Sequence, residues 1–453
     1  MKSETSRPKQ ARRRFSWSTL WRRFGFLFRP GLGIKRWFLV LLAGLFLLAV
    51  GFAMAVLHIY RTTPEASWWT PILSGAALRF LPRPLRVLIF GGAGLALIGW
   101  GLWGLSRSLI APFLREDRSY LDMLARYHQR ERGPHVVVIG GGTGQSTALR
   151  GLKHYTHNLT AVVTVADDGG SSGRLRRTLG ILPPGDIRNC MVALADDEDL
   201  LSRLFQYRFP KNQGSELDGH SFGNLFLTAM TGLTGSFEDA ILEAERVLSL
   251  RGRVVPSTLT LVNLAADVLV PYENRPVRVV GESRIPEVPG RIQRVWLIPE
   301  RPPAFPVAVQ ALLNAQMVVI GPGSLYTSIL PNLLVPEIAA ALRATRALRV
   351  FVVNVANQPG ETDGYFAHDY VEALERHLGS GTIDLVLLNN RTDLELPPGV
   401  EWVQENPRHP IRYPVHRTDL VDEAQPWKHD PHKLARTLIR LLEEQTGPLA
   451  QAG

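Results

Sequence analysis

A short apolar segment followed by clustered glycines constrains this chain more than any other feature. Val136–Ile139 are all aliphatic, and they run directly into Gly140, Gly141, Gly142, Thr143 and Gly144. Four consecutive apolar residues before a glycine cluster are typical of a buried parallel strand. Glycines let the backbone turn tightly and approach a ligand, and a helix starting at Ser146 would present unpaired N–H groups. The sequence therefore predicts a phosphate-binding loop over residues 140–146, the alternative being a purely structural turn.

The spacing within this loop excludes two common nucleotide-binding motifs. Gln145 stands where the dinucleotide fingerprint Gly-x-Gly-x-x-Gly requires its last glycine. No Lys-Ser or Lys-Thr pair follows, so the loop is not a Walker-type P-loop for a triphosphate and magnesium.

The charge of the chain is concentrated at its N-terminus. The sequence has 453 residues and a formal net charge of +10. Residues 1–36 hold eleven Lys and Arg and a single acid, Glu4, so the remainder of the chain is balanced. The basic excess is a tail, and no nucleic-acid-binding face is predicted for the folded part. The single cysteine, Cys190, excludes disulfides within the chain and suits a reducing compartment.

Two uncharged segments follow the basic tail. Trp37–Tyr60 and Val87–Ser106 contain 24 and 20 residues, enough for each to cross a bilayer as a helix. We expect a two-helix membrane anchor over residues 37–106. The basic tail places the N-terminus in the cytoplasm by the positive-inside rule. Residues 107–453 then also face the cytoplasm, and a connecting helix is expected over 107–133.

Strands and helices alternate in the remaining chain, residues 134–446. We predict a Rossmann-like α/β fold, a doubly wound and mostly parallel sheet with an inserted segment over residues 169–316. A disordered tail is expected over 447–453. The predicted strands are Val136–Ile139, Ala161–Val165, Met317–Ile320, Val350–Val355 and Ile383–Leu388. The predicted insertion comprises helices at Asn189–Ala195, Asp199–Tyr207, Phe222–Met230 and Phe237–Leu250 and β-like segments within Val254–Leu297, and a last helix covers Pro431–Glu444.

Polar and glycine-rich segments follow the second predicted strand. Ligands of doubly wound sheets bind outside the carboxyl ends of the strands, so side chains at these positions are site candidates. Adjacent carboxylates can bind a ribose or help to hold a divalent cation such as Mg²⁺, and arginine can clamp a phosphate. The candidates are Asp167, Asp168, Gly170, Ser171, Ser172 and Arg174, with the two aspartates as metal ligands.

Further candidates lie in four later segments. The pattern Gly219-His-Ser-Phe-Gly223 is not a hydrolase nucleophile elbow, because a polar loop and not a buried strand precedes it. No spacing typical of a zinc site occurs. Thr143 and Asn332 are expected to point into one cleft from different glycine loops. The candidates are Asp186, Arg188 and Asn189; His220, Ser221 and Asn224; Gly321, Gly323, Ser324, Tyr326, Thr327 and Asn332; and Gln358.

Six of these motifs, in order, resemble the gluconeogenesis-factor (YvcK) family over residues 136–390. They start at Gly140, Val163, Gly180, Gly219, Gly321 and Gln358. The resemblance implies a nucleotide-binding fold related to the phospholactate transferase CofD. It also implies a bacterial role in carbon metabolism, cell shape and envelope synthesis, with UDP-sugars such as UDP-N-acetylglucosamine as ligands. The chain departs from true transferases at Gly321-Pro-Gly-Ser-Leu325, where they carry Gly-Pro-Ser-Asn-Pro.

Three functions are compatible with this sequence. The first is a nucleotide-sugar sensor tethered to the inner membrane. The second is a magnesium-dependent transferase that uses a nucleoside-diphosphate donor. The third, NAD-dependent redox chemistry, is disfavoured by Gln145. The residues identify no nucleophile or general base, and they allow a homo-oligomer without specifying one.

Overall fold

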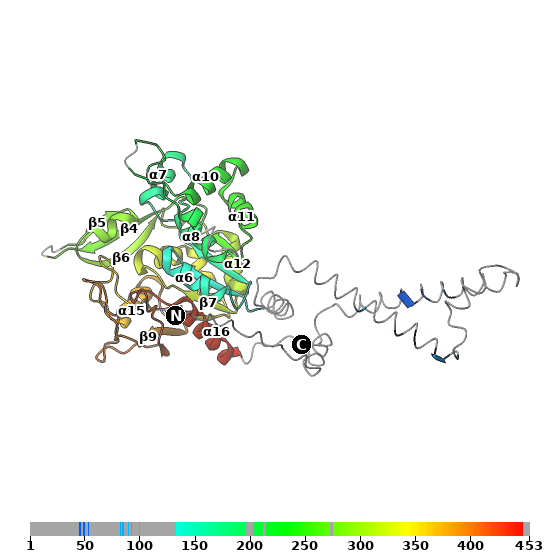
Figure 1. Ribbon diagram of the computed structural model, residues 1–453. Coiled ribbons are helices and arrows are strands. Elements are labelled where there is room, and N and C mark those ends of the chain that lie inside the picture. The colour runs from blue at the N-terminus through cyan, green and yellow to red at the C-terminus, as the bar shows by residue number, and fades with distance from the viewer. Residues whose placement is uncertain are drawn as a thin grey trace, which may run out of the picture. The chain divides into compact units, whose positions relative to one another are not determined.

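The computed structural model describes residues 133–195, 203–211, 214–271 and 275–446, with a few isolated residues between Leu45 and Gly99 (Figure 1). The basic tail, the two predicted membrane helices, the connecting helix and the end of the chain lie outside the described residues, apart from those isolated positions. Within the described part of the chain, no single helix has the length and apolarity of a membrane span.

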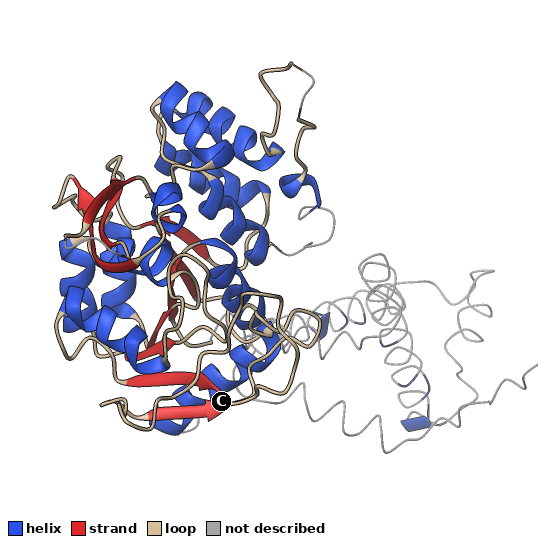
Figure 2. Cartoon of the chain, turned by 90° about the vertical axis from the view of Figure 1, so that its left-hand side faces the viewer, coloured by secondary structure: helices blue, strands red, loops and turns tan. Residues whose placement is uncertain are grey.

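A seven-stranded parallel sheet forms the centre of the described domain. Its spatial order is β10-β9-β8-β7-β1-β2-β3, and helices flank it (Figure 2). Every residue of β1 and β7 is buried, which explains why these segments are continuously apolar. The strands are β1 Val136–Gly140, β2 Leu159–Val163, β3 Arg253–Pro256, β7 Met317–Ile320, β8 Leu348–Val352, β9 Leu385–Asn389 and β10 Val415–Thr418.

The strand order reverses between β1 and β7. From β1 the chain proceeds to β2 and β3 on one side, whereas β7 to β10 extend on the other side. The two central strands pair in parallel register, from Val136 opposite Met317 to Ile139 opposite Ile320. Loops leaving the carboxyl ends of such a pair diverge and leave a crevice between them, which is the usual ligand position in this fold class.

The segment between β2 and β7 contains helices and a second, antiparallel sheet. That sheet has the order β5-β4-β6, with β4 Asn263–Leu269, β5 Val277–Val280 and β6 Arg291–Ile298.

A π-helix, η3, follows β7 at Leu325–Ile329. The α-helices of the described domain are α6 Gly142–Leu152, α7 Gly170–Leu179, α8 Gly185–Leu194, α10 Phe222–Thr234, α11 Phe237–Val247, α12 Pro306–Asn314, α13 Leu330–Leu333, α14 Pro336–Ala344, α15 Ala367–Leu378 and α16 Pro431–Thr446.

The predicted fold class is confirmed, and four details of the prediction are wrong. Helix α6 begins at Gly142 and not at Ser146, since Gly142 takes the first helical position directly after Gly141. Helix α8 begins at Gly185, four residues before the predicted start. Strand β3 pairs in parallel with β2 and belongs to the main sheet, not to a separate insertion. Strand β10 was not predicted, because its half-exposed residues lack a continuous apolar pattern.

Candidate functional site between two glycine loops

The first glycine loop joins β1 to α6. Gly141 is fully extended, and Gly142 takes a positive φ of 62° that favours glycine. A Cβ atom on Gly144 would lie 2.5 Å from the carbonyl oxygen of Pro322 and 2.7 Å from Cα of Gly323. Glycine at this position is therefore required for the two loops to approach each other.

The second glycine loop follows β7. It contains a cis peptide bond between Gly321 and Pro322, and both Gly321 and Gly323 have positive φ. Asn354, after β8, fixes the loop with two hydrogen bonds. Its Oδ1 accepts from the amide of Gly323 at 3.1 Å, and its Nδ2 donates to the carbonyl of Gly323 at 3.0 Å. Ser324 donates to Gln358 at 2.8 Å, which ties the loop to the segment after β8.

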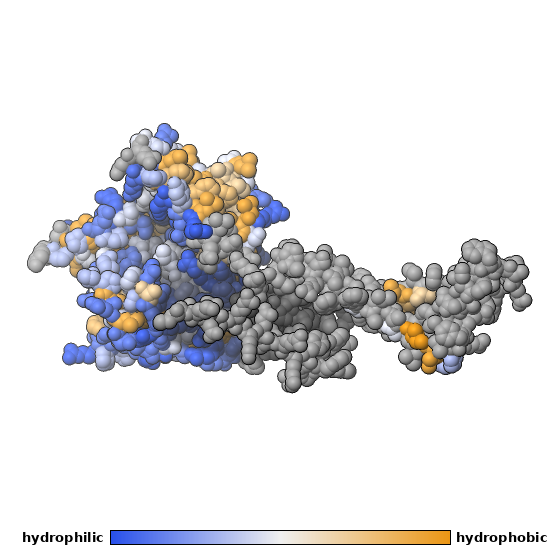
Figure 3. All heavy atoms as spheres, in the orientation of Figure 1, coloured by the Kyte–Doolittle hydropathy of each residue, from blue (hydrophilic) through white to orange (hydrophobic). Residues whose placement is uncertain are grey.

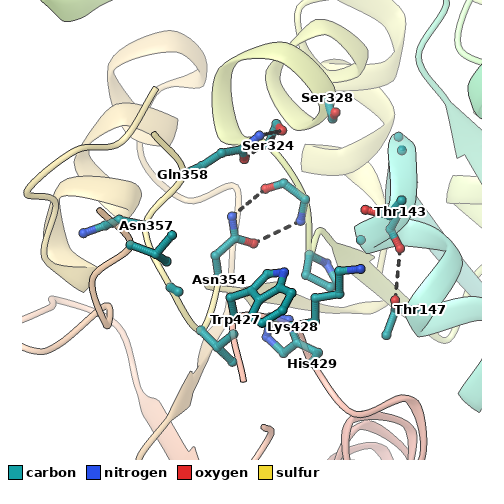
Figure 4. Close-up of a pocket in the computed structure, with 18 of the residues that line it drawn as sticks. Thr143, Thr147, Ser324, Ser328, Asn354, Asn357, Gln358, Trp427, Lys428 and His429 are labelled. Carbon is teal, nitrogen blue, oxygen red and sulfur yellow. Dashed lines mark hydrogen bonds between the residues drawn. The ribbon is translucent and has the colours of Figure 1, made fainter. Parts of the chain in front are cut away.

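A cavity of about 330 Å³ lies between the two loops at the carboxyl ends of β1, β7 and β8. Figure 4 shows Thr143 and Thr147 on one side and Ser324, Asn354 and Gln358 on the other. The lining residues are Gly141, Gly142, Thr143, Gly144, Thr147, Pro322, Gly323, Ser324, Ser328, Asn354, Val355, Ala356, Asn357, Gln358, Pro359, Val400, Trp427, Lys428 and His429.

Three of the lining residues come from the turn before the last helix. Trp427, Lys428 and His429 lie together at the cavity (Figure 4). Asp430 holds this turn in place, since its carboxylate accepts from the amides of His432 and Lys433 at the start of α16. Burial lowers the pKa of His429 to about 4, so this imidazole is neutral at pH 7. Its Nε2 is buried and has no hydrogen-bond partner within the described residues.

An acidic cluster lies beside the first glycine loop. It comprises Asp167 and Asp168 after β2, Asp186 at the start of α8, and Glu282 after β5. Burial, followed by repulsion from Asp167, raises the pKa of Asp186 to about 7. Burial and the three aspartates, with Glu361, raise the pKa of Glu282 to about 8. Asp186 also packs on the loop, because a Cβ on Gly141 would lie 2.7 Å from its Oδ2.

The acidic cluster is not a complete metal site by itself. Among the described residues, no three His, Cys, Asp or Glu side chains are placed to hold a metal ion together. Magnesium is commonly held by one or two carboxylates together with the phosphates of a ligand. The cluster fits that arrangement, with Asp167 or Asp168 as the protein ligand. One oxygen of Asp168 already accepts from the amide of Ser283 at 2.9 Å.

A buried polar network joins the first turns of α7, α8 and α10. Arg188 can only donate, and it donates to Asn224 Oδ1 at 3.1 Å and to the hydroxyl of Ser221. This fixes the orientation of the Asn224 amide, whose Nδ2 donates to Ser171 at 3.0 Å. Ser171 lies 2.9 Å from Nδ1 of His220. Burial and the charge of Arg174 lower the pKa of His220, which favours the neutral imidazole.

Comparison with known proteins places this domain in a family. A family model described as 2-phospho-L-lactate transferase CofD matches residues 136–446. The chain belongs to the CofD family. It is 43% identical over 434 residues to a putative gluconeogenesis factor of Nostoc sp., and the match covers 91% of both chains. It is 46% identical over 325 residues to the gluconeogenesis factor of Bacillus subtilis, covering 69% of this chain and 99% of the relative.

A solved structure supports the same assignment. The crystal structure of a UPF0052-family protein from Bacillus halodurans is 41% identical, with a TM-score of 0.62. It covers 67% of this chain and 99% of that chain. The CofD-family domain therefore makes up almost the whole of some relatives. The Nostoc match, in contrast, extends N-terminal to this domain, because it covers far more of the chain than residues 136–446.

The CofD-family domain brings some of the predicted site residues together at the cavity and buries others elsewhere. Seven line the cavity: Gly141, Gly142, Thr143, Gly144, Gly323, Ser324 and Gln358. Asn332 does not point into it as expected. Its side chain is fully buried, and its Nδ2 donates to the carbonyl oxygens of Gly140 and Ser328, both at 2.8 Å. Asn332 therefore joins the start of the first glycine loop to η3, the helix that follows the second.

The other predicted residues do not line this cavity either. Ser146 is buried and donates to the carbonyl of Gly142. Tyr326 bonds to Tyr365, and Thr327 bonds to Glu361. Arg174 donates to the carbonyl of Asp218. Asp167, Asp168 and Asp186 form the acidic cluster with Glu282, and Ser171, Arg188, His220, Ser221 and Asn224 form the polar network, with Asn189 accepting from Arg188 and Ser172 packed near Asp167.

Sequence reasoning missed several residues of the site. Trp427, Lys428 and His429 are far in sequence from the glycine loops, and only the Asp430-Pro431 helix start indicated an ordered turn there. Asn354 follows β8, as the rule for strand ends would have suggested. Glu282 had no signal, since it reaches the acidic cluster through a short 3₁₀ helix outside the main sheet.

Proposed function

We propose that this CofD-family protein is a sensor that binds a nucleotide-sugar, with UDP-N-acetylglucosamine as the expected ligand, while tethered to the cytoplasmic face of the cell membrane. Its occupancy would link carbon metabolism to envelope synthesis and cell shape. The observation that carries the proposal is the cavity between the two glycine loops at the reversal of the sheet.

The chemistry of the cavity suits a diphosphate joined to a base and a sugar. Main-chain amides at the first turn of α6 can approach phosphate oxygens without obstruction by side chains. In the second glycine loop the amides of Gly321 and Gly323 already donate to Ile139 and Asn354, so this loop contributes close backbone approach and the Ser324 hydroxyl. Lys428 supplies a cationic side chain at the same cavity. The side-chain amide of Gln358, bonded among the described residues only to Ser324, can also bond to a base or a sugar, and Trp427, 40% exposed, offers a stacking surface.

A second candidate function is a magnesium-dependent transferase of the phospholactate-transferase type. The acidic cluster favours it, because Asp186 packs directly against the first glycine loop. In that case Asp167 or Asp168 would hold the ion beside the ligand phosphates. The sensor and the transferase share one cavity and differ in turnover.

Calorimetry with UDP-N-acetylglucosamine tests the shared cavity. Thr143→Ala removes an exposed hydroxyl at the cavity, and Lys428→Met removes its cation. Loss of one hydrogen bond to a charged phosphate costs about 1.5–3 kcal/mol, or roughly ten- to hundredfold in affinity. We expect that loss in both variants, with unchanged thermal stability. Thr260→Ala, on a loop outside the cavity, is the matched control. Wild-type affinity in both variants would rule out this cavity as the phosphate site.

Product analysis separates the two functions. A sensor should return the nucleotide-sugar intact after long incubation with Mg²⁺, and Asp168→Asn should keep its affinity. Asparagine retains the oxygen that accepts from Ser283, so the fold is preserved. A transferase should instead release a nucleotide in the presence of a phosphorylated acceptor, and Asp168→Asn should abolish that release.

A further inference from the structure

Helix α10 carries apolar residues on the side that faces away from the domain. Only Gly223, Asn224 and Leu227 of its thirteen residues are buried. Ala229, Gly232 and Leu233 are exposed, and the Leu233 side chain is 80% exposed. Figure 3 shows an orange region over the part of the domain where Figure 1 labels α10 and α11. A helix that is apolar on both sides is normally covered on both sides.

Helix α11 extends this surface and adds a pattern of charge. Leu242 is 38% exposed and Val247 is 64% exposed. Asp239 and Arg246 stand three residues before and four residues after Leu242, so the three side chains form one stripe along the helix. The acid lies in the first turn of α11, and the exposed arginine lies in its last turn. In a second copy of α11 that runs in the opposite direction, the arginine would therefore lie opposite the aspartate of the first copy.

We propose that the outward faces of α10 and α11 form the contact with a second copy of this chain. A two-fold axis beside Leu242 would pair α11 with its own copy in antiparallel direction. Leu242 then meets Leu242 of the partner subunit. The two-fold symmetry gives two equivalent ion pairs, each between Asp239 of one subunit and Arg246 of the partner subunit. The charge pattern of this face is thus self-complementary, with Arg246 shared between Glu243 of its own helix and Asp239 of the partner subunit. Leu233 of α10 and Val247 of α11 are covered at the border of this contact.

Helix α10 would link the contact with a second copy to the buried polar network of Arg188, Ser221 and Asn224. Ser221 caps this helix by accepting from the amide of Asn224, and both residues bind Arg188. A second copy packed on α10 therefore holds the helix whose first turn carries the network. The pairing itself does not depend on the identity of the ligand.

Cysteine cross-linking in membranes containing the full chain tests the pairing. The native Cys190 is fully buried, so it contributes no background. Leu242→Cys should give a disulfide-linked dimer under mild oxidation, because a residue at a two-fold axis meets its own copy within the Cα separation of about 4.4–6.8 Å that a disulfide needs. Leu313→Cys, 48% exposed on α12, is the matched control and should stay monomeric. Labelling with a maleimide shows whether both thiols are present and reactive.

Charge variants in the Leu242→Cys background test the antiparallel direction. Arg246→Asp places two acids opposite each other and should remove most of the dimer. Asp239→Arg together with Arg246→Asp restores opposite charges and should restore the dimer. The carboxylate of Asp239 also accepts from Ser236, the residue that caps α11, so the thermal stability of each variant is measured alongside. A Leu242→Cys chain that never cross-links, whether its thiol reacts with maleimide or is covered by lipid or another protein, overturns the proposal.

Discussion

At the scale of single residues, Gln145 shows how this domain differs from a dinucleotide-binding one. Its side chain is fully buried beneath the first glycine loop. Its side-chain nitrogen, Nε2, donates to the carbonyl oxygens of Val138 at 2.8 Å and Val162 at 3.0 Å, one on β1 and one on β2. Its Oε1 accepts from Cys190 at 3.3 Å. Glutamine therefore joins β1, which leads into the loop, to its neighbour β2, a task that the glycine of the dinucleotide fingerprint cannot perform.

Asp186 should give the folding stability a distinct dependence on pH. Its pKa rises from 3.8 to about 7 in the folded protein, because burial disfavours the carboxylate. Between these two pH values the native state holds a proton that the unfolded state has released, so stability falls as the pH rises from about 4 to 7. Asp186→Asn imitates the protonated form. It should be more stable than the wild type at pH 8, by a few kcal/mol at most, with no difference near pH 4.

Denaturant unfolding of both proteins at pH 5 and pH 8 measures this effect. Asp430→Asn is a suitable control, since it changes an aspartate that caps α16 outside the acidic cluster. Equal pH slopes for the wild type and Asp186→Asn would mean that Asp186 is ionised in the native state throughout this range.

At the scale of elements, the cavity depends on close contact between the loop after β1 and the loop after β7. Gly144→Ala should force these loops apart, because its Cβ would overlap the carbonyl oxygen of Pro322. Overpacking of this kind typically costs about 1–3 kcal/mol. We expect a lower melting temperature and loss of UDP-N-acetylglucosamine binding, measured by calorimetry. Thr147→Ala lines the same cavity without this overlap and should melt like the wild type. Unchanged melting of Gly144→Ala would contradict the contact.

The elements also show what the sequence could predict and what it could not. Continuous apolar segments such as Met317–Ile320 identified the buried strands, because both faces of a parallel sheet are covered. The glycine loops were found because they follow such strands. Asn332 was misassigned, since polarity alone does not distinguish a side chain that binds ligand from one that supports a loop. Lys428 was missed because only the packing of α16 against α6 brings its turn to the cavity.

At the scale of the whole molecule, the domain should function without the N-terminal segment. Strand β1 begins at Val136, and relatives such as the Bacillus subtilis protein consist almost entirely of the matched region. We expect residues 134–453 alone to be soluble, to unfold cooperatively, and to bind UDP-N-acetylglucosamine as tightly as the full chain in detergent. Calorimetry and thermal melting of both forms make the comparison. Aggregation of the shorter form under conditions where the full chain stays folded would move the domain boundary towards the N-terminus.

We expect the N-terminal segment to hold that domain at the cytoplasmic face of the membrane. Eleven basic residues before Trp37 should keep the N-terminus in the cytoplasm, and two uncharged segments of 24 and 20 residues should return the chain to the same side. Alkaline phosphatase fused within residues 62–67 should therefore be active, and green fluorescent protein fused after Gly453 should fluoresce. Exchanging the two reporters is the control and should silence both. An inactive phosphatase at 62–67, together with fluorescence of green fluorescent protein fused at the same place, would contradict the prediction. The first uncharged segment would then not cross the membrane, and the two-span anchor would be wrong.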